Sequence, residues 1–305
     1  MKELLKNINY NYNMNIENIH KLGITTINDI FVINSSSKKY IVKIYNVDEE
    51  KQIKDSLVTQ KKIYESLGIV ADVIENKENE LYTKYNNKFY AIQEYIEEQN
   101  DIKFNKIKET AKSLLFLHKK LREFDESTFK NKKEYKDYIA IKQNIEESRN
   151  ILKKTKIEKE VKDLFNSLLN KRENILGKYK CEYNPKRCQV IHRDIRPSNI
   201  IVSNDKVYFI DFDYIAYGDL LFEIGSAAML ISNFEIKKAK EFIKMYNLYL
   251  ERKYTEKEIF KNLLEYYVQS DFPIKLINKV ENEALMGFIE NRIKCLEFCK
   301  KIICE

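Results

Sequence analysis

The chain has 305 residues, of which 44% are hydrophobic and 33% are charged, and the charges are spread along the sequence. This length and composition argue against a disordered protein and predict one large domain or two lobes that share a cleft. The net charge of +7 arises where acidic residues alternate with the lysines. It therefore indicates a lysine-rich soluble surface and no nucleic-acid partner.

The sequence gives no indication of a membrane partner. Its first fifteen residues are polar, and no apolar stretch approaches the 18 residues that a transmembrane helix needs. The five cysteines include no CxxC pair, and no histidine lies near them at metal-ligand spacing. We therefore expect a cytoplasmic protein with reduced thiols.

The first 96 residues have the pattern of a small α+β unit. Residues 3–21 are expected to form a polar, partly helical lead-in. After it, segments rich in Ile, Val and Tyr alternate with turn residues, which predicts about five strands. A helix is expected over Asp48–Leu67, where an apolar stripe ends at Gly68. The clearest strands are expected at Ile30–Ile33, Tyr40–Tyr45, Leu81–Tyr85 and Lys88–Tyr95.

Beyond residue 100 the periodicity becomes helical. Helices are expected over Ile107–Leu121, Tyr135–Leu152 and Glu158–Leu176, and the chain after residue 233 reads as about four further helical pieces. The predicted fold class is therefore α+β, with an antiparallel-sheet lobe over residues 1–96 that carries one helix. A larger, mainly helical lobe is expected over residues 97–305.

One segment carries most of the chemical information, namely VIHRDIRPSNIIVSNDKVYFIDFD over residues 190–213. Two apolar strands flank the turn residues 203–206, so a hairpin is expected that pairs residue 200 with about residue 209. This pairing brings Asn199 and Asp211 side by side, with Asp194 in the loop just before. Oxygen ligands of this kind suit Mg²⁺ that also binds phosphates.

The H-R-D-x-x-x-x-N motif, the hairpin and the D-F-D that follows closely resemble the catalytic and metal-binding loops of protein-kinase-like enzymes. The sequence looks most like the aminoglycoside phosphotransferase and choline kinase family. Within it, the chain resembles the spore-coat kinase-like proteins. The resemblance covers nearly the whole chain and implies a two-lobed kinase fold.

The resemblance also implies roles for individual residues. Asp194 would be the catalytic base, and Asn199 and Asp211 would hold Mg²⁺. Asp213 would either assist the metal or cap the following turn. Nucleotide binding would involve the third-strand lysine, the phosphate-covering loop and the backbone of the hinge. These positions correspond to Lys43, to Gly23 and Asn28, and to Glu94 and Ile96. ATP is the expected nucleotide, and GTP is left open.

The chain departs from the family pattern at two positions. The helix carboxylate that holds the lysine is replaced by Gln60, with Glu65 as another possible partner in a different helical phase. Arg193 stands where the aminoglycoside branch often has glycine. The first departure leaves open whether the lysine is held by an ion pair, and Arg193 is expected to make local contacts within its loop.

A small-molecule acceptor is favoured over a protein. Asp211 and Glu223 are only twelve positions apart and no A-P-E motif follows, so no segment is available to order a peptide. We therefore predict transfer of the γ-phosphate to a hydroxyl of a small molecule. Two alternatives are a degenerate kinase fold with a nucleotide-binding or spore-coat role, and an unusual protein kinase. The acidic residues that could contact a cationic acceptor are Asp271, Glu281, Glu283 and Glu290.

Overall fold

The computed structural model describes residues 2–22, 28–35, 38–46, 49–99, 105–129, 138–176, 184–270, 274, 276–277 and 280–305. The chain forms two compact units. The first combines Met1–Lys130 with His192–Ala216, and the second combines Asn131–Ile191 with Tyr217–Glu305. The two units are described separately below.

The first unit is built on a six-stranded antiparallel sheet with the order β1-β2-β3-β6-β4, in which β5 also pairs with β6. In β3, Lys43 lies opposite Ala91 and Ile41 lies opposite Gln93 of β6. The strands are β1 (Ile16–Lys21), β2 (Asp29–Ser35), β3 (Lys39–Tyr45), β4 (Val73–Ile74), β5 (Thr83–Tyr85) and β6 (Lys88–Glu94).

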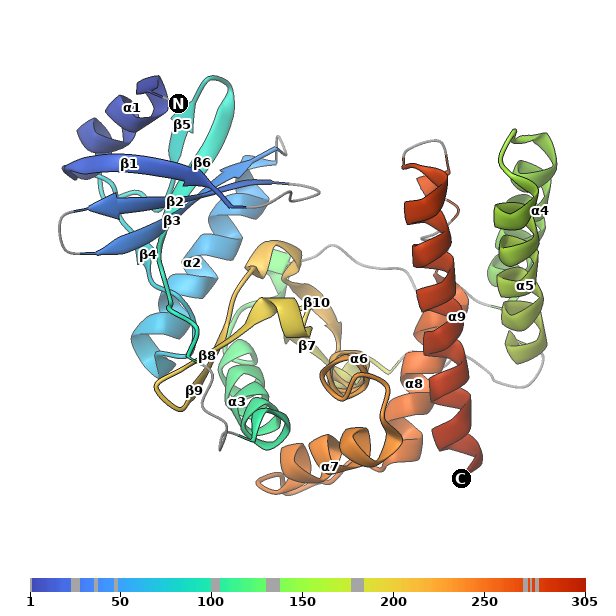
Figure 1. The fold of residues 1–305 in the computed structure, drawn as a ribbon. Coiled ribbons are helices and arrows are strands. Elements are labelled where there is room, and N and C mark those ends of the chain that lie inside the picture. The colour runs from blue at the N-terminus through green and yellow to red at the C-terminus, as the bar shows by residue number, and fades with distance from the viewer. Residues whose placement is uncertain are drawn as a thin grey trace. The chain divides into compact units, whose positions relative to one another are not determined.

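The sheet lies between two helices, α1 (Lys2–Tyr12) and α2 (Glu50–Leu67) (Figure 1). Side chains alternate between the faces of a strand, so Val42 packs in the core with α1 while Tyr45 packs in the core with α2. Lys43, one residue from Val42, therefore projects from the α2 face. The end of α2 is fixed by Gly68, whose φ of 58° is favourable for glycine and whose N–H bonds to the carbonyl of Tyr64 at 2.9 Å.

The lead-in, expected to be partly helical, contains helix α1 and also strand β1, for which no bounds were predicted, and strand β4 was not predicted. The lead-in sequence KELLKNINYNY is mostly polar, yet Leu4, Ile8 and Tyr12 recur every four residues and are all buried. They close the face of the sheet that α2 leaves open, together with Ile33 and Ile92. Because both faces of the sheet are buried, each face needs a helix to cover it, whereas only one helix was expected in this region.

The predicted hairpin is confirmed and belongs to the first unit. Strands β8 (Ile200–Ser203) and β9 (Lys206–Phe209) pair antiparallel, with Ile200 opposite Phe209. The turn residues Asn204 and Asp205 both have positive φ, as a type I′ turn requires. Backbone bonds tie the hairpin to the rest of the unit, from the N–H of Phe209 to the carbonyl of Ile69 at 2.9 Å and from Gln99 to Val202 at 2.8 Å.

Helix α3 (Lys106–Leu121) confirms the predicted helix after the sheet and packs with β9. Three short 3₁₀ turns complete the first unit: η1 (Glu126–Phe129), η3 (Pro197–Asn199) and η4 (Phe212–Tyr214). The prediction of a lobe boundary after residue 96 stays a prediction. In the structure, α3 and the hairpin are grouped with the sheet.

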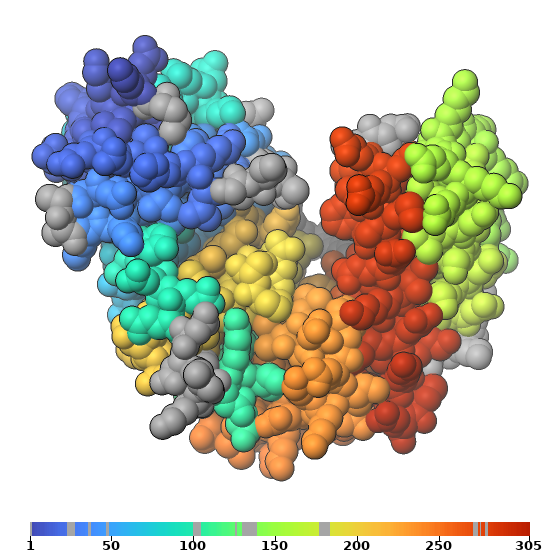
Figure 2. Space-filling model, in the orientation of Figure 1, coloured from blue at the N-terminus to red at the C-terminus, as the bar shows by residue number. Residues whose placement is uncertain are grey.

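The second unit is mainly helical. The predicted pair α4 and α5 is confirmed, and the two helices lie side by side (Figure 1). Helix α9 packs with both α5 and α8, and its surface adjoins that of α4 and α5 in the space-filling view (Figure 2). The helices are α4 (Tyr138–Lys154), α5 (Lys159–Leu176), α6 (Leu220–Ile231), α7 (Ile236–Asn247), α8 (Glu256–Gln269) and α9 (Asn282–Cys304).

Two details of this unit differ from expectation. Helix α6 was not predicted, because its sequence is apolar on nearly all sides and carries no helical stripe. After residue 233 the described residues contain three α-helices, where four pieces were expected. A 3₁₀ turn, η2 (Pro185–Arg187), and a two-stranded pairing of β7 (Cys188–Ile191) with β10 (Ala216–Asp219) complete the second part.

Over the described residues, no helix has both the length and the apolar character needed to span a bilayer.

Candidate active site

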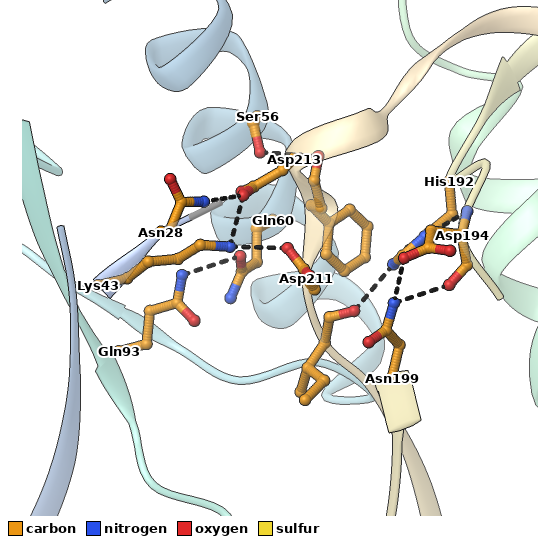
Figure 3. Close-up of polar contacts among 12 residues, drawn as sticks. Asn28, Lys43, Ser56, Gln60, Gln93, His192, Asp194, Asn199, Asp211 and Asp213 are labelled. Carbon is orange, nitrogen blue, oxygen red and sulfur yellow. Dashed lines mark hydrogen bonds and ion pairs between the residues drawn. The ribbon is translucent and has the colours of Figure 1, made fainter. Parts of the chain in front are cut away.

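Lys43 is the centre of a buried ion-pair cluster in the first unit. Its Nζ lies 2.7 Å from Oδ1 of Asp211 and 2.7 Å from Oδ2 of Asp213 (Figure 3). The lysine side chain is only 7% exposed, so strand β3 holds it firmly against the residues that follow the hairpin. The structure thus brings together three residues that are separated by about 170 positions in the sequence and were predicted to share one site.

The cluster carries more negative than positive charge. Burial acts to raise the pKa of Asp211, but the ammonium group of Lys43 outweighs it and lowers this pKa below the usual range. Burial raises the pKa of Asp213, and the charge of Asp211 adds to this increase. Burial opposes the charged form of Lys43, yet the two carboxylates raise its pKa. One ammonium group therefore does not neutralise both carboxylates, and a second cation would be favoured there.

A second cluster surrounds Asp194. The Nδ2 of Asn199 donates to the carbonyl of Asp194 at 2.9 Å and to its Oδ2 at 2.6 Å (Figure 3). Nε of Arg196 lies 3.3 Å from the same Oδ2. Because both partners contact Oδ2, the other carboxylate oxygen is the one suited to accept a proton from a hydroxyl group.

His192 holds the loop that carries Asp194. The ring is fully buried, and its Nε2 lies 3.1 Å from the carbonyl of Ile210, which can only accept. Nδ1 then accepts the N–H of Asp194 at 3.3 Å. This fixes the tautomer with the proton on Nε2, and it joins the catalytic-loop segment to the residues before Asp211. His192 therefore has a structural role, because both of its ring nitrogens bond to backbone groups.

Two site residues have left-handed backbone conformations that non-glycine residues rarely adopt. Arg193 has a φ of 70°, and Asp211 has a φ of 67° and a ψ of 70°. Such conformations cost on the order of 1 kcal/mol each and persist only where the surroundings enforce them. The φ of Arg193 lies in the region that glycine adopts without a steric penalty, so arginine is an unusual residue for this conformation.

Gln60 does not contact Lys43 directly. It is buried on α2 and donates its Nε2 to the carbonyl of Ala71 at 2.8 Å. Its Oε1 accepts from Gln93 at 3.4 Å (Figure 3). Glu65, the other predicted partner, is exposed on α2. Whether a helix residue holds Lys43 was left open by the sequence, and in the structure Asp211 and Asp213 form its ion pairs.

The remaining predicted nucleotide contacts are placed as follows. Asn28 is buried and donates to Oδ2 of Asp213 at 2.6 Å, which supports the ion-pair cluster. Glu94 ends β6, and its N–H donates to the carbonyl of Asp72 at 2.8 Å. Ile96 follows two residues later, and Gly23 lies outside the described residues.

Some residues of the site were not predicted from the sequence. Helix α2 reaches the turn that contains Asp213, since Nε2 of Gln52 donates to the carbonyl of Asp213 and Ser56 donates to that of Phe212. Tyr214 is 43% exposed, and the carboxylates around it help burial to raise the pKa of its phenol. No local pattern marks these residues, because their roles depend on contacts across 150 or more positions.

The oxygen atoms of the cluster fit a divalent cation. Asp211 and Asp213 provide carboxylates, and Asn199 has an amide oxygen that its bonds to Asp194 do not use. Among the described residues, no three His, Cys, Asp or Glu side chains form a complete metal site. This is the arrangement expected for Mg²⁺, which binds one or two carboxylates and completes its shell with water and phosphate oxygens.

In the second unit, the described acidic residues on or before α9 do not converge. Glu281, Glu283 and Glu290 are all exposed, and Asp271 lies outside the described residues. Glu223 is buried on α6.

Asp219, which was not predicted as a functional residue, caps the N-terminus of α6. Its carboxylate accepts from Arg187 at 3.0 Å and from Asn262 at 2.9 Å. The Gly218-Asp219 pair before an apolar run was a signal for this cap.

Comparison with known proteins connects this geometry to a family. The profile described as "Phosphotransferase enzyme family" matches residues 19–258. A LicA homolog from Mycoplasma capricolum subsp. capricolum is 36% identical over 76 residues, which are 24% of this chain and 31% of the relative. The matched part thus spans about a third of that relative's length.

The solved structures that resemble this chain share its fold. A spectinomycin phosphotransferase in complex with ADP and spectinomycin has a TM-score of 0.68 at 16% identity, covering 98% of this chain and 93% of the other. An amicoumacin kinase has a TM-score of 0.67 at 12% identity, covering 96% and 92%. A choline kinase from Cryptosporidium parvum Iowa II has a TM-score of 0.64 at 15% identity, covering 99% and 96%. These likenesses confirm the predicted α+β kinase-like fold, with an antiparallel sheet and a mainly helical C-terminal part.

Proposed function

Because the chain belongs to the phosphotransferase enzyme family, we propose that it transfers the γ-phosphate of ATP to a hydroxyl group of a small molecule, with Mg²⁺ as cofactor. One observation carries the proposal. A buried lysine, two carboxylates and the Asp194–Asn199 pair come together within one compact unit. Phosphoryl transfer needs these groups: a cation for the phosphates, oxygen ligands for the metal and a base for the attacking hydroxyl.

Each group has a distinct part in the proposed reaction. Lys43 would neutralise phosphate oxygens from a rigid strand, and Asp211, Asp213 and Asn199 would hold the metal. When bound, Mg²⁺ supplies charge neutralisation at the bridging phosphate oxygens. Asp194 would orient the acceptor hydroxyl through the carboxylate oxygen that Asn199 and Arg196 leave available, and would take up its proton.

The length of the chain after the metal-binding turn supports a small acceptor. From Asp211 the chain passes through η4 and β10 and enters α6 at Leu220. These nine positions leave no room for the long segment that orders a peptide in protein kinases. Two structurally similar proteins are a spectinomycin phosphotransferase and an amicoumacin kinase. We propose that the acceptor of this chain belongs to the same broad class of hydroxyl-bearing small molecules.

The test is ADP release from Mg·ATP across a panel of hydroxyl compounds. The panel contains aminoglycosides, choline, ethanolamine, thiamine, homoserine, methylthioribose and a generic protein. Asp194→Asn serves as the blank, because it removes the base and leaves the metal ligands. A compound that releases ADP with the natural protein and not with the blank supports the proposal. Equal ADP release by both proteins would contradict the role of Asp194, and transfer to the protein substrate alone would favour an unusual protein kinase.

A second candidate is a kinase-fold protein with weak or no turnover, which binds nucleotide or has a structural role. Gln60 favours this candidate, because Lys43 lacks a helix carboxylate and is paired with the metal-binding residues themselves. Mg·ATP binding without turnover on any acceptor, measured by calorimetry, would support it. Turnover on one panel compound would exclude it.

We also propose that, within the family, this chain is most similar to the spore-coat kinase-like proteins. This proposal rests on the sequence motifs alone. A cytoplasmic or spore-associated location follows from it. Fractionation of the producing cells during sporulation would test this placement, and recovery of the protein only from non-sporulating cells would contradict it.

A further inference from the structure

Two glutamine side chains form a short relay between α2 and β6. Gln60 donates its Nε2 to the carbonyl of Ala71 at 2.8 Å, and its Oε1 receives Nε2 of Gln93 at the longer distance of 3.4 Å. Gln60 is 1% exposed, and Gln93 is half-buried at the end of the sheet. All three residues belong to the first unit, and Figure 3 shows both amides beside Lys43.

The direction of this relay is fixed at one end. A backbone carbonyl can only accept, so Gln60 must offer its NH₂ group to Ala71 and its oxygen to Gln93. Gln93 must then offer its own NH₂ group to Gln60. If either amide were turned over, like atoms would face each other within the relay. The oxygen of Gln93 is consequently the end of its amide that remains for another donor.

The register of the sheet places this oxygen near the expected position of the base. Lys43 lies opposite Ala91 and Ile41 lies opposite Gln93, so Lys43 and Gln93 share one face of the sheet. They are two residue pairs apart, or roughly 7 Å along the strands. Gln93 also directly precedes Glu94, the first of the proposed base-binding backbone positions. A nucleotide with its phosphates at Lys43 and its base at Glu94 and Ile96 therefore passes Gln93.

We infer that Gln93, oriented by Gln60, selects adenine nucleotides over guanine nucleotides by presenting a hydrogen-bond acceptor to position 6 of the purine. The inference rests on the proposed function and narrows it, since the choice between ATP and GTP was open from the sequence. Adenine has an amino group at position 6, which donates to the oxygen of Gln93. Guanine has an oxygen there, so two acceptors would face each other and remain unpaired.

This role also gives a reason for the glutamine at position 60. A carboxylate at that position could hold Lys43, but it could not donate to the carbonyl of Ala71. Because Asp211 and Asp213 already hold Lys43, the helix residue is available to orient Gln93. Gln60 thus differs from the family's helix carboxylate because it binds the amide of Gln93, which faces the base, and not Lys43.

The first experiment measures binding of Mg·ADP, Mg·IDP and Mg·GDP to the unaltered protein by calorimetry, so that no acceptor is needed. Hypoxanthine has the 6-oxygen of guanine without its 2-amino group. We expect ADP to bind about 10- to 100-fold more tightly than both IDP and GDP. Equal binding of ADP and IDP would overturn the inference, whatever the affinity of GDP. Failure of all three to bind would instead contradict the proposed function.

Variants of Gln60 then test whether this residue orients the amide of Gln93 or only fills space beside it. Gln60→Met leaves Gln93 free to turn and present its NH₂ group, so the ADP-to-IDP ratio should fall to within about threefold. Gln60→Glu still accepts from Gln93, so it should keep the ratio even though Ala71 loses its donor. Gln143→Met, at an exposed position on α4, is the matched control. A ratio that is unchanged in Gln60→Met, or lost equally in both Gln60 variants, would contradict the relay.

Discussion

Lys43 on β3 is buried and bound by two carboxylates, whereas Glu281, Glu283 and Glu290 on or next to α9 are exposed. The first group lies in the unit that contains the sheet, and the second lies in the helical unit. Around Lys43, every polar side chain of the cluster has a named partner within 3 Å. On or next to α9, these three acidic side chains are glutamates, and all of them are exposed.

For the proposed phosphoryl transfer, this difference separates the nucleotide side from the acceptor side. Phosphate, metal and proton chemistry require fixed charges, and buried ion pairs hold such charges in place because removing one partner is costly. Acceptor recognition can be changed on a surface without disturbing the core. The proposed nucleotide side is therefore readable from this chain, while the acceptor must be found by experiment.

Among the predicted substitutions, Asp194→Asn should have the largest effect on activity. It leaves the Lys43 cluster intact and removes the proposed base, so kcat should fall by about 10²- to 10⁴-fold while the affinity for Mg·ATP changes less than about threefold. Steady-state rates and calorimetry would check both values. Asp205→Asn, in the exposed hairpin turn, is the control with the same chemical change. Normal turnover by Asp194→Asn would remove this residue from the mechanism.

Lys43→Met should reduce the stability of the first unit. It leaves Asp211 and Asp213 without their cation in a buried site, which should cost about 3 kcal/mol of the free energy of unfolding and also weaken Mg·ATP binding. Denaturant unfolding would measure the loss. Lys39→Met on the same strand, where the side chain is 53% exposed, should change stability by less than about 0.5 kcal/mol. Similar stabilities of the two variants would show that the buried pair contributes little.

Asp211→Ala tests the metal assignment. Removing this carboxylate should weaken binding of Mg·ATP at least about tenfold, and it should reduce the dependence of binding on Mg²⁺ concentration. Calorimetry at several Mg²⁺ concentrations would follow both effects. Asp163→Ala, exposed on α5, is the control. An unchanged affinity in Asp211→Ala would mean that another group holds the cation.

The smallest effect is expected on the acceptor side. Replacing Glu281, Glu283 and Glu290 together by glutamine should leave stability within about 0.5 kcal/mol, because all three are exposed. For a cationic acceptor, kcat/KM should fall by at most about threefold, because solvent screens exposed charges. A loss of more than tenfold would show that these residues form a specific acceptor site, and the contrast with Lys43 would disappear.

The sequence predicted the parts of the site that depend on short separations. The hairpin pairs Ile200 with Phe209 as expected, because its turn and strands are local. The resemblance to the kinase family also predicted that Lys43 would share the site with Asp211, and the two side chains form an ion pair. The contacts of Gln60 could not be predicted, because they depend on how α2 packs against residues 11 and 33 positions away.

Composition hid part of the fold. Helix α1 is rich in asparagine and lysine, so its three buried residues at four-residue spacing were not recognised as a helical stripe. Helix α6 was difficult to recognise for the opposite reason. Nine of its twelve residues are buried, so no polar face reveals the helical period. In both cases the pattern departs from the amphipathic average on which prediction depends.

The first unit is discontinuous in sequence, because Met1–Lys130 is completed by His192–Ala216. A chain cut after the sheet would keep Lys43 but lose Asp194, Asn199 and Asp211. Recombination between relatives therefore has natural crossover points near residues 130, 192 and 216. Exchange of the segments between these points would import new helices, while Lys43, Asp194, Asn199 and Asp211 would be inherited together.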